Sequence, residues 1–254
     1  MSISINRLSE AWFEFKGVRS DTLDIYMTQM PVRELPARQL TRTKVAGRSG
    51  EVRISDDSYD DITINIAFKL LNPASINAVA ALLTGSGTLR FSDDPLYELD
   101  AVIETPPTRQ SVNYRYDAQT YSVSFVCHPF KKLHTPAADI TVTTSGTTAT
   151  NPGTAPALPR VTITGSGSFN VTIAGMTMFF HDVTTGVIVD SELGDVLNAA
   201  GTLLANNNAS GELFKVAPGQ FMVSWVNGGF DDETETAVAG SVASVVIEPR
   251  WRYF

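Results

Sequence analysis

The sequence predicts a mainly β protein with two halves: a first half of β-strands with one helix, and a second half made almost entirely of β-strands. Two observations predict this. Many short segments alternate apolar and polar residues with a period of two, as half-buried strands do. The chain has 254 residues, of which 43% are apolar, so it can form one large or two modest domains with buried cores.

The clearest strands of the first half lie at residues 62–68 and 121–127. In each, every second residue is large and apolar, so one face of the strand should be buried. These residues are Ile62, Ile64, Ile66 and Phe68 in the first strand, and Tyr121, Val123, Phe125 and Cys127 in the second.

One segment, NPASINAVAALLTGSG at residues 72–87, predicts a helix. Asn72 can cap its start, Pro73 can occupy the first helical position, and Gly85 can end it. The apolar residues that would share one face are Ile76, Val79, Ala80 and Leu83.

The second half consists of short β-branched segments separated by turn residues, which is typical of a β-sandwich. The segment GSGSFN at 165–170 begins like a phosphate-binding loop, but no helix follows it. We therefore interpret it as a β-turn between two strands. In residues 221–225, Phe221, Val223 and Trp225 share a face, which favours packing in the core.

Residues 135–160 separate the halves and predict a linker between domains at 1–134 and 161–254. A run of Thr, Ser, Ala and Gly is followed by NPGTAPALPR, which has three prolines in ten residues. Proline lacks a backbone N–H, and the run offers no large apolar side chain for a core. We expect this segment to be extended and stiff.

The charge is unevenly distributed. The net charge of −8 divides into −1 for residues 1–135 and −7 for residues 136–254. This balance argues against sequence-specific binding of nucleic acid. One local exception is the segment 31–53, which has six basic and two acidic residues. It predicts either a solvated strand edge or a charged contact surface for a partner, and the sequence favours neither.

Targeting signals are missing from the sequence. No apolar run approaches the roughly 20 residues of a membrane span, and the N-terminus has no apolar region of a signal peptide. We therefore expect no membrane insertion. The single cysteine excludes an internal disulfide and predicts synthesis in a reducing cytoplasm.

No catalytic or metal-binding pattern emerges, so we expect no enzyme activity and no cofactor. The three histidines, His128, His134 and His181, have no second His or Cys at ligand spacing apart from Cys127 beside His128, and a strand turns those two to opposite sides. Cys127 continues a strand alternation, so we expect a buried thiol rather than a nucleophile. The acidic segments 55–61 and 92–100 precede strands and lack calcium-loop spacing, which favours turns.

Several segments together resemble the distal tail protein (Dit) family of long-tailed, non-contractile bacteriophages. The resemblance covers nearly the whole chain and depends on the order and spacing of the segments. They lie at residues 13–39, 45–52, 59–68, 72–103, 151–167 and 186–225.

The resemblance implies an N-terminal ring-forming (belt) domain that assembles into a hexamer, and a C-terminal galectin-like β-sandwich at the ring periphery. The ring would join the tail tube protein above to the tip or baseplate protein below, with a central channel for DNA. The protein would then be a structural component of the virion, at the phage tail tip, made in the cytoplasm of the host bacterium.

Two sets of candidate site residues follow. The basic segment would meet the acidic SDDP loop of the next subunit, across an interface formed by Arg38, Arg42, Lys44, Arg48, Asp93 and Asp94. The alternative function is a carbohydrate- or host-surface-binding module that uses the galectin-like domain, with Trp225 stacking on a sugar ring.

Overall fold

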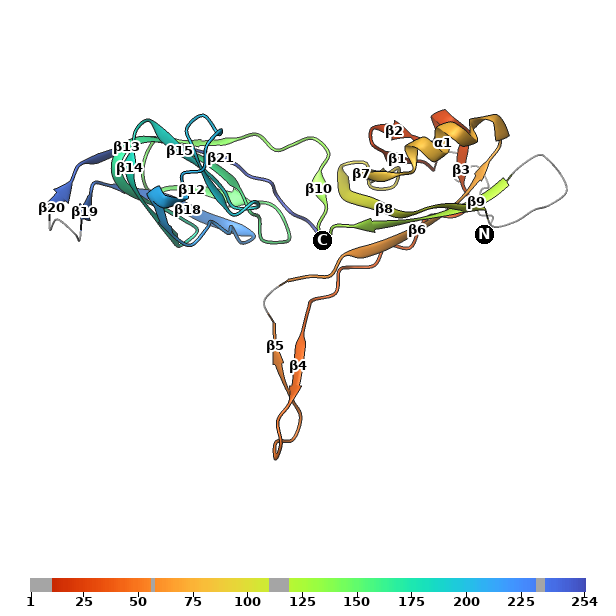
Figure 1. Cartoon of the computed structure of the whole chain (residues 1–254), viewed down its shortest axis with the longest axis horizontal. Helices are drawn as coiled ribbons and strands as arrows, with labels where there is room; N and C mark the ends of the chain where they lie inside the picture. Colours follow the sequence, from red (N-terminus) through yellow and green to blue (C-terminus); the bar gives the residue numbers. More distant parts are fainter. Residues whose placement is uncertain (1–10, 56–57, 110–118, 232–235) are drawn as a thin grey trace. The chain divides into compact units, whose positions relative to one another are not determined.

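The computed structural model describes residues 11–55, 58–109, 119–231 and 236–254 (Figure 1). The chain divides into two compact units: unit 1 is residues 1–134 together with Phe254, and unit 2 is residues 135–253. Each unit has its own hydrophobic core. The prediction of a mainly β fold is confirmed, and α1 (Ile76–Leu82) is the one α-helix among the described residues.

Unit 1 is built on an eight-stranded antiparallel sheet in the order β2-β1-β7-β8-β9-β6-β3, with β10 beside β8. The bounds of its strands are β1 (Phe13–Phe15), β2 (Val18–Arg19), β3 (Ile25–Met27), β6 (Ile62–Leu70), β7 (Gly85–Phe91), β8 (Tyr97–Arg109), β9 (Gln119–Cys127) and β10 (Lys132–Leu133). A 3-10 turn, η2 (Ser20–Leu23), joins β2 to β3.

The period-two pattern places the core of unit 1 as predicted. Ile64, Ile66 and Phe68 on β6 are buried, and so is every second residue of β9 from Tyr121 to Cys127. Each strand therefore has one apolar face in the core and one polar face outside it. Phe125 lies at the centre, where Phe13 and Phe15 pack edge-on against it.

The predicted helix covers this core. A 3-10 turn, η3 (Pro73–Ser75), leads into α1, and the Ala74 N–H donates to the Asn72 side chain at 3.1 Å. Asn72 therefore caps this turn, whereas Ser75 is at the N-cap position of α1 and makes no side-chain capping bond. Val79 and Leu83 are buried against the sheet. Ala80 is exposed, so its predicted place on the buried face was wrong.

Strands β4 (Thr41–Lys44) and β5 (Glu51–Ile54) form a separate two-stranded sheet. Residues 41–54 are called the arm below. The arm's strands pair with each other and, among the described residues, with no other strand (Figure 1).

Unit 2 is a nine-stranded antiparallel sheet wrapped around an apolar core. Its strands are β11 (Ile140–Val142), β12 (Thr147–Asn151), β13 (Arg160–Ile173), β14 (Met176–Val183), β15 (Gly186–Asp190), β16 (Asp195–Asn198), β17 (Ala209–Gly211), β18 (Gly219–Asn227) and β21 (Gly240–Glu248). A 3-10 turn, η4 (Asn206–Asn208), and a hairpin of β19 (Gly229–Asp231) and β20 (Thr236–Val238) complete it.

The expected β-turn at 165–170 is instead the middle of one long strand, β13. Gly167 adopts φ +76°, but the resulting irregularity is a bulge within the strand. Before the bulge β13 pairs with β15 and β21, and after it β13 pairs with β14 and β18. The prediction was wrong because a bulge glycine and a turn glycine have the same local sequence, and only distant strands decide between them.

The predicted linker at 135–160 was also wrong, because most of this segment belongs to the fold of unit 2. Strand β11 pairs with β21, and β12 pairs with β18. Ala155 and Ala157 are fully buried, and their N–H groups donate to the carbonyl oxygens of Arg252 and Val216. Pro156 lies between these two donors, so the residue without an N–H is not at a position where the pairing uses one. Backbone pairing needs no large side chains, which is why the composition misled the prediction.

Candidate assembly surface

The arm is a hairpin whose residues are nearly all exposed to solvent. It has four basic residues (Arg42, Lys44, Arg48 and Arg53) and one acidic residue (Glu51), so its net charge is +3. Val45 and Ile54 are 48% and 60% exposed, which adds apolar surface to the charged one. The arm therefore presents both kinds of surface that protein interfaces use.

The strand register places the charges on one face of the arm. Arg42 lies opposite Arg53, and Lys44 lies opposite Glu51. Cross-strand partners share a face, so the second face consists of Thr41, Thr43, Val52 and Ile54. Like charges in directly opposed positions destabilise a hairpin. A partner with negative charge would relieve this repulsion.

Arg38 lies just before the arm, and Arg48 lies in its turn. Arg38 forms an isolated β-bridge with Tyr59 at the base of the arm, where the Gln39 side chain donates to Asp60 at 2.7 Å. Arg48 lies in the turn, where its N–H donates to the carbonyl oxygen of Val45 at 3.2 Å. Asp56 and Asp57 of the acidic segment 55–61 lie outside the described residues.

The SDDP loop, residues 92–95, does not meet the arm's predicted interface residues within the chain. Asp93 forms an ion pair with Arg33, whose guanidinium also lies over the ring of Phe91. Asp94 forms an ion pair with Lys131 at 3.2 Å. Both carboxylates predicted to bind a neighbouring subunit thus have basic partners in their own chain. Arg33 belongs to the basic segment 31–53, whereas no pattern in the sequence indicated Lys131.

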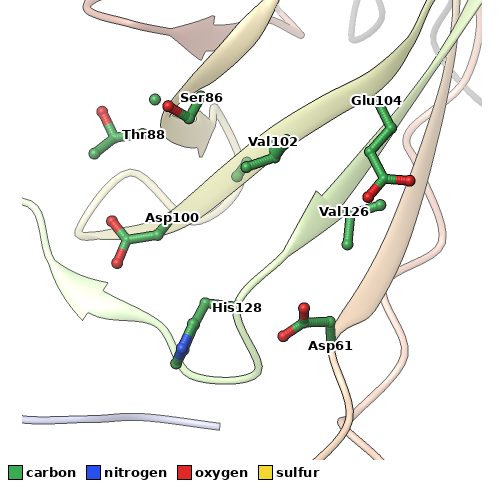
Figure 2. Close-up of a pocket in the computed structure, with 10 residues that line it drawn as sticks. Asp61, Ser86, Thr88, Asp100, Val102, Glu104, Val126 and His128 are labelled. Carbon is green, nitrogen blue, oxygen red and sulfur yellow. The ribbon is translucent and has the colours of Figure 1, made fainter.

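A second acidic surface lies on the outer face of the unit 1 sheet, in a groove of about 500 Å³ (Figure 2). Asp100, Val102 and Glu104 alternate along β8 and therefore point to the same side. Val126 of β9 lies opposite Val102 in the strand register, and Asp61 lies just before β6. We call this feature the acidic groove.

The carboxylates of the acidic groove differ in their partners. Asp100 forms an ion pair with Lys132 at 2.5 Å. Asp61 and Glu104 are exposed and have no ion-pair partner among the residues that the structure describes. Figure 2 shows these three carboxylates spaced around the two valine side chains, with His128 at the lower edge. The groove thus combines an apolar floor with an acidic rim.

Cys127 lies on the core side of β9, so the prediction of a buried thiol is confirmed. Burial, and to a smaller extent the negative charge of Asp61, raise the pKa of Cys127 to about 12. A thiol with this pKa is a poor nucleophile at neutral pH. Within the described ranges, no group of three or more His, Cys, Asp or Glu residues is placed to hold a metal ion.

Trp225 is partly buried on β18 and packs against the core of unit 2. The backbone N–H of Trp225 donates a hydrogen bond to the Ser145 hydroxyl at 2.8 Å. The two residues predicted to share its face, Phe221 and Val223, are buried. Trp225 therefore contributes to packing. No helix in the described part of the chain is long and apolar enough to cross a membrane.

Comparison with known proteins identifies similar solved structures but no similar sequence. No protein-family model matches the sequence, and no curated protein matches it. Among solved structures, the chain is similar to the crystal structure of the SPP1 Dit protein (gp 19.1), with a TM-score of 0.67 and 14% sequence identity. The match covers 94% of this chain and 98% of that one. The chain has the Dit fold.

The Dit fold confirms the resemblance that the ordered segments of the sequence indicated. The SPP1 protein is described as a paradigm of the hub adsorption apparatus in phages that infect Gram-positive bacteria. Because the match includes nearly the whole of both chains, it covers both units of this chain.

Proposed function

We propose that this protein is a structural hub of a phage tail. In this proposal six copies form a ring that joins the tail tube protein above to the tip or baseplate protein below, and DNA passes through its central channel. The observation that supports the proposal most is the end-to-end match to SPP1 Dit, which covers 94% of this chain. The protein would be made in the cytoplasm of the host bacterium and would end in the virion, at the tail tip.

The arm supports assembly independently of that match. A two-stranded hairpin is only marginally stable in water on its own. This one is exposed, has a net charge of +3 and presents apolar side chains. Such a segment gains stability by lying on a neighbouring subunit. In our proposal unit 1 forms the ring, and unit 2 is a galectin-like domain at its periphery.

Negative-stain electron micrographs of the purified full chain test the proposal, with rings that have a central hole as the expected result. The variant Arg42→Glu/Arg48→Glu should weaken the ring, because it removes two positive charges from the arm and adds two negative ones. The exposed Lys215→Glu in unit 2 is the control and should leave the rings intact. Absence of rings from the wild-type protein would contradict the hub, and an unchanged mass of the double variant in light scattering would contradict the role of the arm.

The second function class, a carbohydrate- or host-surface-binding module, receives less support. Its candidate residue, Trp225, packs against the core. A glycan array decides between the two classes: binding that disappears in a folded Trp225→Ala variant would favour the sugar-binding function.

A further inference from the structure

We propose that the acidic groove of one copy receives the basic face of the arm of a second copy. The inference rests on the proposed ring and deepens it, because it names the two surfaces that meet. It replaces the SDDP loop, which the sequence suggested as the acidic partner of the arm.

The arm needs a negatively charged partner. Arg42 and Arg53 face each other across the hairpin, and Lys44 shares their face. Glu51 is the one carboxylate in residues 41–54 and lies opposite Lys44. The repulsion between the two arginines is therefore not neutralised within the hairpin.

The SDDP loop cannot supply this partner without losing its own contacts. Asp93 pairs with Arg33, and Asp94 pairs with Lys131. A neighbouring arm would have to displace these pairs, and the exchange of one ion pair for another gives little net free energy.

The acidic groove has free carboxylates. Asp61 and Glu104 have no ion-pair partner in the described part of the chain, and Asp100 shares one exposed pair with Lys132. Guanidinium groups bind carboxylates through two parallel hydrogen bonds, so Arg42 and Arg53 suit these two acids. Mutual neutralisation would stabilise both surfaces.

The floor of the acidic groove suits the rest of the arginine side chain. Val102 is 41% exposed and lies opposite Val126 in the sheet, between Asp100 and Glu104 along β8. Arginine buries its aliphatic stem on apolar surface while its charged end reaches polar groups. The pattern of apolar floor and acidic rim therefore matches the chemistry of a basic hairpin face (Figure 2).

The arm and the acidic groove are different surfaces of the same chain. A contact between two different surfaces is heterologous, and repeating it gives a ring when the rotation closes. One contact of this kind per neighbour thus suffices for the assembly that we propose.

A charge-swap experiment tests the inference. The arm variant is Arg42→Glu/Arg53→Glu, and the groove variant is Asp61→Lys/Glu104→Lys. Each alone should raise the concentration for half-assembly at least about tenfold, measured by analytical ultracentrifugation, because each places like charges in contact. An equimolar mixture of the two variants should assemble again, since each altered arm then meets an altered groove and each wild-type arm meets a wild-type groove.

Two controls accompany the swap. The variant Asp139→Lys/Glu212→Lys makes the same change in charge at exposed sites of unit 2 and should assemble as the wild type does. Circular dichroism and the thermal midpoint establish that the arm and groove variants are folded.

The outcomes separate this inference from the proposed ring. If the wild type forms rings and the groove variant forms them at the same concentration, the ring stands and the groove contact is overturned. If both variants fail to assemble and their mixture also fails, the two surfaces do not meet, and the inference is overturned. If the wild type is monomeric at every concentration, the ring itself is contradicted, and the groove contact with it.

Discussion

At the scale of single residues, burial decides the chemistry of the one thiol. The pKa of Cys127 is raised to about 12, first by burial and then by the charge of Asp61. At pH 8 roughly one molecule in ten thousand then has a thiolate, which is the reactive form. We expect iodoacetamide to leave Cys127 unmodified in the folded protein and to alkylate it after unfolding, as followed by mass spectrometry.

The matched control for this labelling is Thr63→Cys, which introduces a thiol on the exposed face of β6. It should be alkylated in the folded protein while Cys127 is not. Equal rates at the two positions would contradict the role of burial.

The buried carboxylate of Asp190 is stabilised by several donors. Arg250 binds both of its oxygens, at 2.8 and 3.1 Å, and the N–H groups of Glu192 and Leu193 donate to it at 3.2 Å. Burial raises the pKa of Asp190, but the hydrogen bonds and the charge of Arg250 outweigh it, and the pKa is lowered overall. This pair fastens the segment after β21 to the end of β15.

The variant Asp190→Asn tests this contact. Removing one partner leaves Arg250 without its main counterion, so we expect a loss of about 3 kcal/mol in the free energy of unfolding at pH 7. Because the pKa of Asp190 is lower in the folded chain than in the unfolded chain, its contribution is complete above about pH 4 and is lost as the pH falls through the folded-state value. Urea unfolding at pH 7 and pH 3 should therefore show a smaller difference from the wild type at pH 3.

The control for the pH series is Asp182→Asn. Asp182 is exposed and adopts φ +54°, a conformation that Asn tolerates. It should change the stability little at either pH. A difference between Asp190→Asn and the wild type that stays the same at both pH values would show that the ionised carboxylate is not what stabilises unit 2.

At the scale of elements, the bulge of β13 depends on close backbone approach. A methyl group on Gly240 would lie 1.8 Å from the carbonyl oxygen of Ser168. Backbone atoms cannot move away as a flexible side chain does, so Gly240→Ala should destabilise unit 2 by about 3 kcal/mol. The neighbouring Ser241→Ala is exposed and should change the stability by less than about 0.5 kcal/mol in the same urea titration. Equal midpoints for the two variants would contradict this account.

The buried strand faces could be predicted from the sequence because the side-chain period of a strand is local. Ile64 and Ile66 lie on the same face whatever strand lies beside them. The course of β13 could not be predicted, because Gly167 forms a bulge only when β15 and β14 pair with the two parts of the strand.

The candidate site could be predicted only in part, because local composition is visible in the sequence and contacts between distant residues are not. The basic character of residues 31–53 is visible in the composition, and the arm contains most of it. The partners of Asp93 and Asp94 are 60 and 37 residues away, and only the folded sheet brings them together. The acidic groove likewise combines Asp61, just before β6, with residues of β8, and one strand, β9, lies between β6 and β8 in the sheet.

At the scale of the whole molecule, the two units differ in charge and have separate cores. The half that contains unit 1 is nearly neutral at −1, while the remainder has a net charge of −7. Low net charge reduces repulsion between copies packed closely together, and high net charge keeps a surface soluble. The distribution is therefore consistent with an assembly in which unit 1 makes the contacts between subunits.

The separate cores predict two unfolding transitions. The buried side chains of unit 1 and those of unit 2 form two distinct apolar clusters, and each cluster can unfold cooperatively by itself. Differential scanning calorimetry of the full chain should resolve two transitions, one for each unit. Gly240→Ala and Asp190→Asn should both lower the midpoint of the unit 2 transition. A core variant of unit 1, Phe125→Leu, should lower the other, because it removes a ring that Phe13 and Phe15 contact. A single transition that all three variants shift together would contradict the independence of the two cores.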